Sequence, residues 1–412
     1  MACLDNGSTR FPYIYPMKPP FKKVLLDTQE RTAVDAFEID SCKAGAGGKG
    51  AWQVRKITLR GGTQEGVDLV EIENGKLSFS VLPTRGMSIL EGSSEGVRLG
   101  WDSPVKDPVH PASINLHDRG GLGWLKGFNE WIVRCGLSSI GAPGVDAMVD
   151  NTGNPAEEHL TLHGKIANTP ARKVSLEITE EEIILRGEVD ETMLFGPALR
   201  LNTEIRTKFD SGLLEIRDTV TNIGATPTDH QLLYHVNYGS PLLAKGTRLV
   251  CPFKVLAPRD ARAAEGIATF DEYEGPVEGF VEQAYFLELA GKPSTGATAV
   301  MLRNAEGDTA SVLRYAVDHF PSFTLWKNTA AREDGYVTGL EPATSFPSAR
   351  GFERSKGRVV RLKGGESRST TLTVELLSTR EAVRAVEAEI EELQGSVDPE
   401  RHPEPIDRFS NI

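Results

Sequence analysis

Short alternating runs joined by tight turns dominate the chain from about residue 52 and limit its fold more than any other feature. Residues 67–73 alternate apolar with acidic side chains, and residues 77–82 alternate again. Between them stand Asn74 and Gly75, a pair favoured in the type I′ turn of two-residue hairpins. This segment is therefore predicted to form a β-hairpin.

The same pattern recurs along most of the chain. It predicts hairpins over residues 173–190 and 199–223, and further strands over 229–238, 247–256, 280–289, 297–303, 310–317, 322–327, 357–363 and 368–377. No strand–helix–strand alternation is visible, which argues against doubly wound and α/β-barrel folds. We therefore expect an all-β fold, a large antiparallel β-sandwich.

The chain divides into three parts on this pattern. Residues 1–48, rich in proline and aromatic side chains, are expected to form an N-terminal arm with a short helix over 28–40. Residues 49–378 are expected to form the sandwich. Residues 379–412 are expected to hold a C-terminal helix and a polar tail, because apolar residues recur at helical spacing over 380–393.

Charge and composition narrow the function classes. The chain is 39% hydrophobic with a net charge of −12, values typical of a soluble globular protein and unfavourable for a nucleic-acid partner. No apolar run is long enough for a membrane span or a signal peptide. The four cysteines, Cys3, Cys42, Cys135 and Cys251, show no paired spacing. We therefore expect reduced thiols and a cytoplasmic location.

Two strand-like runs each present one group suited to proton transfer. His235 shares a face with Asn237 in the first run, and Glu341 stands between Gly339 and Pro342 in the second. Histidine and glutamate have ordinary pKa values on either side of neutrality, so together they can serve as acid and base. The alternative is a buried histidine satisfied by a backbone carbonyl and a solvated surface glutamate.

Several further polar residues stand at turns or in the irregular stretch 102–155, where Trp124 also lies. They are Arg85, His163, Asn129 and Glu130. Polar groups combined with aromatic side chains are typical of sugar sites, because sugars present both hydroxyls and apolar faces. The chain lacks a Walker loop, a GxSxG motif and the histidine spacing of a metal site. We therefore expect no metal and no cofactor.

Four runs of sequence carry a resemblance to a known family. They are LPTRGMSI at 82–89, LHGKIANTPA at 162–171, YHVNYGSPLL at 234–243 and GLEPATSFP at 339–347. Over residues 50–378 the chain resembles the aldose 1-epimerase (mutarotase) superfamily, in particular a little-characterised branch of aldose-epimerase-like proteins. The resemblance implies a galactose mutarotase-like supersandwich.

The resemblance also implies a reaction and roles for residues. Glu341 matches the family's general base and His235 its general acid, which together open and reclose the sugar ring. His163 matches a histidine that hydrogen-bonds the sugar, and Arg85 matches an arginine that holds a hydroxyl. The implied partner is a small-molecule sugar, and a homo-oligomer is compatible with the chain.

Other contacts and other functions stay open at this point. Local sequence alone, without the resemblance, leads us to expect that Asn237, Asn129 and Glu130 contact substrate. The family's further sugar-gripping aspartate has no clear match, and the candidates for it are Asp271, Glu282 and Asp318. The alternative functions are a non-catalytic carbohydrate-binding protein and a glycoside-processing enzyme, although the latter ordinarily needs two carboxylates. For a phosphorylated sugar, Arg85, Lys165 and Lys327 could supply positive charge.

Overall fold

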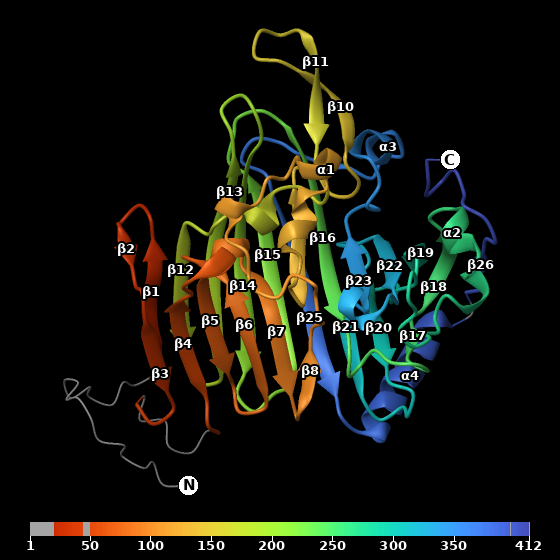
Figure 1. Ribbon diagram of the computed structural model, residues 1–412, viewed down its shortest axis with the longest axis horizontal. Coiled ribbons are helices and arrows are strands. Elements are labelled where there is room, and N and C mark those ends of the chain that lie inside the picture. The colour runs from red at the N-terminus through yellow and green to blue at the C-terminus, as the bar shows by residue number, and fades with distance from the viewer. Residues whose placement is uncertain (1–19, 44–49, 396, 412) are drawn as a thin grey trace.

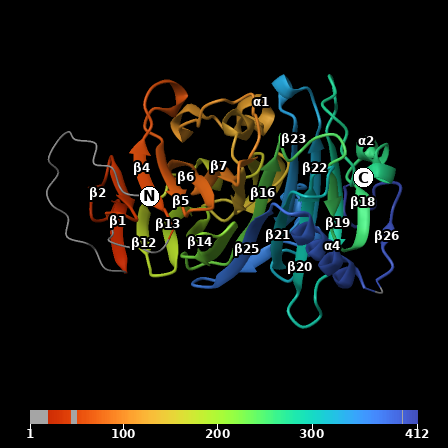
Figure 2. The same ribbon diagram turned by 90° about the horizontal axis from the view of Figure 1, so that it is seen from below.

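Two large antiparallel sheets lie face to face in the computed structural model of this chain (Figures 1 and 2). The structure describes residues 20–43, 50–395 and 397–411. The predicted all-β sandwich is therefore confirmed.

The first sheet has ten strands. In spatial order they are β17 (Arg248–Val250), β20 (Ala297–Arg303), β21 (Ala310–Ala316), β25 (Ser367–Leu377), β15 (Leu213–Asn222), β14 (Ala198–Lys208), β13 (Glu182–Thr192), β12 (Lys173–Ile178), β1 (Phe21–Asp27) and β2 (Thr32–Ala33).

The second sheet has fourteen strands. Along its main path lie β26 (Glu400–Arg401), β18 (Phe253–Pro258), β19 (Gln283–Leu289), β22 (Ser322–Asn328), β23 (Val337–Ala343), β16 (Thr228–Tyr238), β9 (Ile132–Leu137), β7 (Ser88–Ser94), β6 (Leu77–Leu82), β5 (Asp68–Glu73), β4 (Gln53–Thr58) and β3 (Phe37–Asp40). Off this path, β24 (Val360–Leu362) pairs with β16 and β8 (Val97–Leu99) pairs with β7.

Helices are few and short among the described residues. They are α1 (Asp118–Gly121), α2 (Ala261–Ala264), α3 (Arg350–Ser355) and α4 (Arg380–Gln394), with single 3₁₀ turns at Gly62–Gln64, Pro83–Arg85, Pro111–Ser113, Gly123–Gly127, Ile166–Asn168, Ile267–Thr269 and Arg332–Asp334. None of the helices in these ranges has the length and apolar character needed to cross a membrane.

The main hydrophobic core lies between the two sheets. Burial alternates along β14 and β15, as the sequence alternation requires when one face of a sheet is covered. One continuous cluster joins side chains of both sheets, including Leu201, Ile216, Leu372, Val70, Phe79, Tyr234 and Val236.

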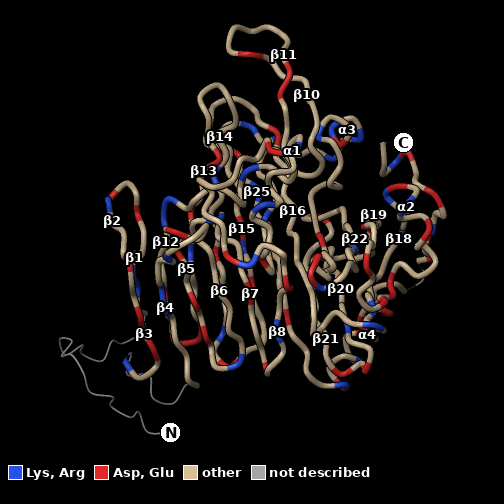
Figure 3. Tube along the Cα trace, viewed as in Figure 1, with Lys and Arg blue, Asp and Glu red and all other residues tan. Residues whose placement is uncertain are grey.

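Lys and Arg are interspersed with Asp and Glu along the chain trace (Figure 3).

The C-terminal helix is confirmed. Thr379 caps α4 by accepting a hydrogen bond from the Ala382 N–H, as an N-cap residue does. Val383, Val386 and Ile390 are buried in a cluster with side chains of β20 and β21. Figure 2 shows α4 on the outer side of the first sheet.

Three expectations about local structure are wrong. Residues 28–40 contain β2 and β3 rather than a helix. The stretch 102–155 was expected to be irregular but contains β9. All six residues of β9 are buried, so its sequence lacks the alternation by which a strand is recognised. Cys42 is disulfide-bonded rather than reduced. Cys135 and Cys251 are free thiols.

One hairpin stands apart from both sheets. β10 (Gly144–Val149) and β11 (Pro155–Leu160) form a separate two-stranded ribbon that projects from the body (Figure 1). A lone two-stranded ribbon is marginally stable in water, so its position depends on contacts at its base.

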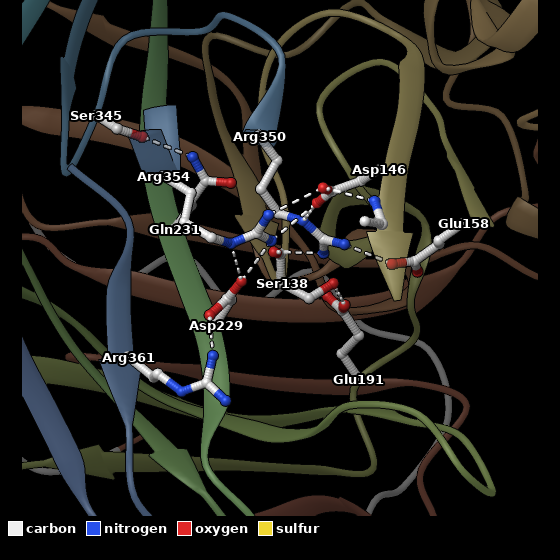
Figure 4. Close-up of polar contacts among 11 residues, drawn as sticks. Ser138, Asp146, Glu158, Glu191, Asp229, Gln231, Ser345, Arg350, Arg354 and Arg361 are labelled. Carbon is white, nitrogen blue, oxygen red and sulfur yellow. Dashed lines mark hydrogen bonds and ion pairs between the residues drawn. The ribbon is translucent and has the colours of Figure 1, made fainter. Parts of the chain in front are cut away.

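A network of ion pairs anchors this hairpin (Figure 4). The Asp146 carboxylate in β10 accepts from Arg350 Nε at 2.5 Å and from Arg354 Nη2 at 2.8 Å, and both arginines belong to α3. Arg350 also pairs with Glu158 of β11 at 2.5 Å, and Arg354 pairs with Asp229 at the start of β16 at 2.7 Å. The network therefore connects the hairpin, α3 and the second sheet.

Replacing Asp146 by Asn should destabilise the fold by about 3 kcal/mol, because it leaves a buried arginine short of a carboxylate. The hydrogen bonds from Arg354 and Arg350 lower the pKa of Asp146 to about 2. Its stabilising contribution is therefore present above the ordinary aspartate pKa of 3.8 and is lost as the pH falls toward 2. Chemical denaturation at pH 7 and at acid pH measures both effects.

The matched control is Asp407→Asn, since the Asp407 carboxylate pairs with Lys356 at the surface and is 87% exposed. This change should cost less than about 1 kcal/mol. Equal effects of the two substitutions would contradict the anchoring role of Asp146.

Candidate active site

His235 lies near the middle of the second sheet, in β16 between β9 and β23. Leu232, Tyr234 and Val236 of the same strand belong to the core between the sheets. Because strand residues alternate in direction, His235 points to the outer face of this sheet. The segment around α1 lies against that face (Figure 2).

Glu341 of β23 is in direct contact with His235. Its Oε1 lies 3.1 Å from His235 Nε2, and both side chains are almost fully buried, at 3% and 5% exposure. Gly339 makes this contact possible, because a Cβ atom there would lie 2.7 Å from His235 Cε1 and 2.9 Å from Glu341 Oε1. The predicted acid–base pair is thus brought together.

Asn237 fixes which nitrogen of His235 faces Glu341. Its Nδ2 donates to the carbonyls of Glu130 at 3.0 Å and of His235 at 3.2 Å. Its Oδ1, 2.6 Å from His235 Nδ1, must therefore be the acceptor there. Nδ1 of His235 carries a proton, and Nε2 is the atom that faces the carboxyl group.

Burial shifts the pKa of each group toward its neutral form. Burial lowers the pKa of His235 to about 4, against a raising effect of the hydrogen bond to Asn237. Burial raises the pKa of Glu341 well above 4.5. Both shifts favour neutral imidazole next to a neutral carboxylic acid, whose proton bridges Oε1 and Nε2. Moving that proton to Nε2 gives a carboxylate and an imidazolium.

Aromatic rings surround the His235 imidazole. The ring centroids of Phe128 and Trp326 lie 5.0 Å and 5.3 Å from it, and that of Trp124 lies at 6.3 Å. Trp124 and Phe128 come from the stretch 102–155, where a binding site was expected. These rings exclude water and provide apolar faces against which a sugar ring could stack.

Three polar atoms near the pair have no hydrogen-bond partner within the described residues. They are His163 Nδ1, Trp124 Nε1 and Thr324 Oγ1, all buried. The His163 ring is 4.7 Å from Trp124 and 5.7 Å from His235, and Thr324 is the cross-strand neighbour of Glu341. Buried polar atoms are normally satisfied, so these three are free to hydrogen-bond with a polar group brought to the pair.

The strand ends beside the pair carry acidic groups. Glu282 Oε2 accepts from Trp326 Nε1 at 2.7 Å, and its Oε1 accepts from Arg259 Nη2 at 2.9 Å. Arg259 also pairs with Asp260 at 2.8 Å. The Glu282 side chain is 44% exposed. Its negative charge also raises the pKa of Glu341, second to burial. Two carboxylates thus share one guanidinium here.

Arg85 and Glu130 lie behind the pair and hold each other. Arg85 donates four hydrogen bonds, to Glu130 Oε1, Asn168 Oδ1 and the carbonyls of Val109 and Gly127, so each of its three nitrogens has a protein acceptor. Both side chains are fully buried. The backbone carbonyl of Glu130 in turn accepts from Asn237. This arrangement supports the site from behind, and the expected contact of Arg85 with a sugar hydroxyl stays a prediction.

The remaining expected residues lie elsewhere. Asn129 donates to the Val105 carbonyl and lines a separate small cavity of about 130 Å³. Lys327 donates to three backbone carbonyls, those of Thr269, Phe270 and Glu272. Of the three acidic residues considered for the sugar-gripping role, Glu282 contacts the site, because it accepts a hydrogen bond from Trp326.

Sequence reasoning missed Phe128, Trp326, Thr324 and Arg259. Trp326 and Thr324 do leave a signal, because they alternate with the buried Phe323 and Leu325 and so share the outer face with Glu341. No comparable signal marks Phe128, which reaches the site through loop geometry. Within the described ranges, no three His, Cys, Asp or Glu side chains gather as a metal site would require.

This chain is similar to a known protein family and to proteins of known structure. A family model described as a domain of unknown function (DUF4432) matches residues 64–376. A candidate aldose 1-epimerase of known structure from Klebsiella pneumoniae is 35% identical, with a TM-score of 0.88 over 94% of this chain and 99% of that one. This match confirms the resemblance to aldose epimerases. A search of curated proteins found no significant match.

More distant structures share the fold alone. A galactose mutarotase-like protein from Clostridium acetobutylicum is 14% identical, with a TM-score of 0.55 over 79% of this chain and 98% of that one. A galactose 1-epimerase from Lactobacillus acidophilus is 11% identical, with a TM-score of 0.51 over 79% of this chain and 99% of that one. The sandwich is thus galactose mutarotase-like.

Replacing Gly339 by Ala should separate His235 from Glu341 and destabilise the fold by about 1–3 kcal/mol, the usual cost of overpacking a dense interior. Chemical denaturation measures the cost, and a crystal structure of the variant shows the separation. Gly275→Ala is the control, because a Cβ atom at Gly275 meets nothing within 4 Å. A Gly339→Ala protein with unchanged stability and an intact contact would refute the steric argument.

Proposed function

The chain belongs to the family described as a domain of unknown function (DUF4432), and on that premise we propose that it interconverts the α and β anomers of an aldose by opening and closing the sugar ring. The observation that carries the proposal is the buried contact between His235 and Glu341. A pair that shares one proton can accept a proton from one oxygen while it donates a proton to another.

In the proposed reaction, the Glu341 carboxylate removes the proton of the anomeric hydroxyl while His235 Nε2 protonates the ring oxygen. The bond between the anomeric carbon and the ring oxygen breaks, and a carbonyl group forms. Rotation about the neighbouring C–C bond and reclosure with the roles reversed give the other anomer. Both oxygens are attached to the same carbon, so two groups in contact can serve both.

The geometry favours this function over the alternatives. A binding module has no need for a desolvated acid and base, whose burial costs stability. A glycosidase ordinarily sets two carboxylates across the scissile bond. Here the contact of Glu341 is an imidazole, and the nearby Glu282 is engaged by Arg259 and Trp326.

The same surroundings favour an uncharged sugar. Glu282 and Asp260 together outweigh the single charge of Arg259, so a phosphate group would be repelled. Of the three residues considered for a phosphate, Arg85 and Lys327 donate to protein acceptors, which leaves Lys165 alone as a cation for it. The orphaned atoms His163 Nδ1 and Trp124 Nε1 suit sugar hydroxyls. We propose a neutral aldose as substrate.

Replacing His235 by Asn or Glu341 by Gln should lower the rate of anomer exchange about a hundredfold to ten-thousandfold, because each change removes a proton-transfer group and keeps the approximate shape. NMR saturation exchange on a panel of fresh aldoses measures the rate. Glu381→Gln, at an exposed position of α4, is the control and should leave it unchanged. The assignment is wrong if both variants equilibrate a sugar as fast as the parent protein.

The rate of anomer exchange should fall at both low and high pH, because the pair is active only while it holds one proton. A second proton inactivates the pair, and because the pKa of His235 is lowered to about 4, the acid limb of kcat/KM should lie near pH 4. The shared proton leaves at high pH, which gives an alkaline limb. An acid limb near the ordinary histidine value of 6.5 would instead indicate an independent imidazole.

A further inference from the structure

A cavity of about 570 Å³ shares no residue with the acid–base site. Its lining comes from both sheets and from the turns that follow β21 and α3. The polar side chains at its wall are those of Lys254, Glu288, Asp318, Ser322, Thr344, Arg358 and Arg368. Its volume lies within the range of pockets that hold small molecules.

Arg368 of β25 has an unusual environment in this wall. Thr370, Leu372 and Val374 alternate with exposed or half-buried residues and are buried, so Arg368 shares their inward face at the end of the sandwich. Its Nη2 donates to the carbonyls of Asp318 and His319 at 3.0 Å each. Its Nε is buried and has no hydrogen-bond partner in the described part of the chain.

No carboxylate neutralises this guanidinium. Every other arginine in the described ranges that is buried or half-buried forms an ion pair, for example Arg85 with Glu130, Arg134 with Asp218 and Arg350 with Asp146. Arg368 forms none with any described residue. Burial lowers the pKa of Arg368, which reflects the cost of holding a charge away from water. Arg368 is half-buried, so its unpaired charge is only partly solvated, and an anion bound beside it would offset that cost.

Other groups at the cavity suit an anion. The Thr344 hydroxyl accepts from the Leu232 N–H at 3.0 Å, so its own proton is free to be donated. Ser322 is buried at 2% exposure and also lines the cavity. Lys254 is exposed and forms no ion pair among the residues described. Of the two acidic residues, Glu288 is paired with Arg408 and Asp318 forms no ion pair among the described residues, so the unpaired Lys254 and Arg368 leave the wall with one positive charge in excess.

A role as a simple brace explains only part of this arrangement. The two carbonyls of the turn after β21 engage one nitrogen of Arg368 and leave Nε orphaned. His319 Nδ1 in the same turn is also buried and without a partner in the described ranges. A brace needs neither an adjoining cavity nor unpaired donors.

We propose that this cavity binds a small oxyanion, a carboxylate or phosphate group, with Arg368 as its principal ligand. The Thr344 and Ser322 hydroxyls add hydrogen bonds, and Lys254 adds charge at the wall. A guanidinium suits such groups because its N–H donors form charge-assisted hydrogen bonds with oxyanions, and the unpartnered Nε of Arg368 is such a donor. The site is separate from the acid–base pair and does not depend on the proposed epimerase activity.

Isothermal titration of the full chain with inorganic phosphate and with acetate tests the proposal. The protein should bind at least one of the two, and Arg368→Gln should weaken that binding at least about tenfold, as loss of a charge-assisted hydrogen bond does. Arg368→Lys should retain part of the affinity. Tighter binding of phosphate or of acetate identifies which oxyanion the site prefers.

Two further variants keep the test decisive. Lys254→Gln, at an exposed position, should fold normally and weaken binding severalfold. Arg361→Gln, an exposed arginine that pairs with Asp229 outside this cavity, should bind like the parent. The proposal is overturned if the parent protein binds neither anion, or if Arg368→Gln and Lys254→Gln bind as tightly as the parent does.

Discussion

The removal of His235 and Glu341 from water is the constraint on which the rest of this site depends. A buried carboxylate and a buried imidazolium are each costly, and together they lower that cost by sharing one proton. This shared proton is also what acid–base chemistry between two sugar oxygens requires. Desolvation displaces the pKa of each group toward its neutral form, which is the state that the proposed reaction starts from.

The surrounding structure keeps the pair in contact. Neighbouring strands of a sheet hold the two groups at one register, and the missing side chain at Gly339 leaves room for them. Asn237 orients the imidazole through the Glu130 carbonyl, and the Arg85–Glu130 ion pair fixes that segment from behind. Arg85, Glu130 and Asn237, which were expected to contact substrate, thus form a chain of contacts that leads to the histidine.

Strand alternation made the sandwich predictable, and two motifs at strand ends made the pair predictable. Alternation failed where both faces of a strand are covered, as in β9, whose buried Arg134 is neutralised by Asp218 from the opposite sheet. The aromatic enclosure was only partly predictable, because Phe128 reaches His235 by loop packing that no local pattern encodes. The sequence also gives no sign of Arg368, because whether an arginine has a carboxylate partner depends on the folded structure.

The protonation state of His235 tests the central claim most directly. Nitrogen-15 NMR of the histidine ring can identify which nitrogen carries the proton. The account predicts a protonated Nδ1 and an Nε2 that accepts a hydrogen bond, unchanged from about pH 5 to pH 8, because the pKa of His235 is lowered to about 4. A proton on Nε2 with a bare Nδ1, or a titration near the ordinary value of 6.5, would contradict it.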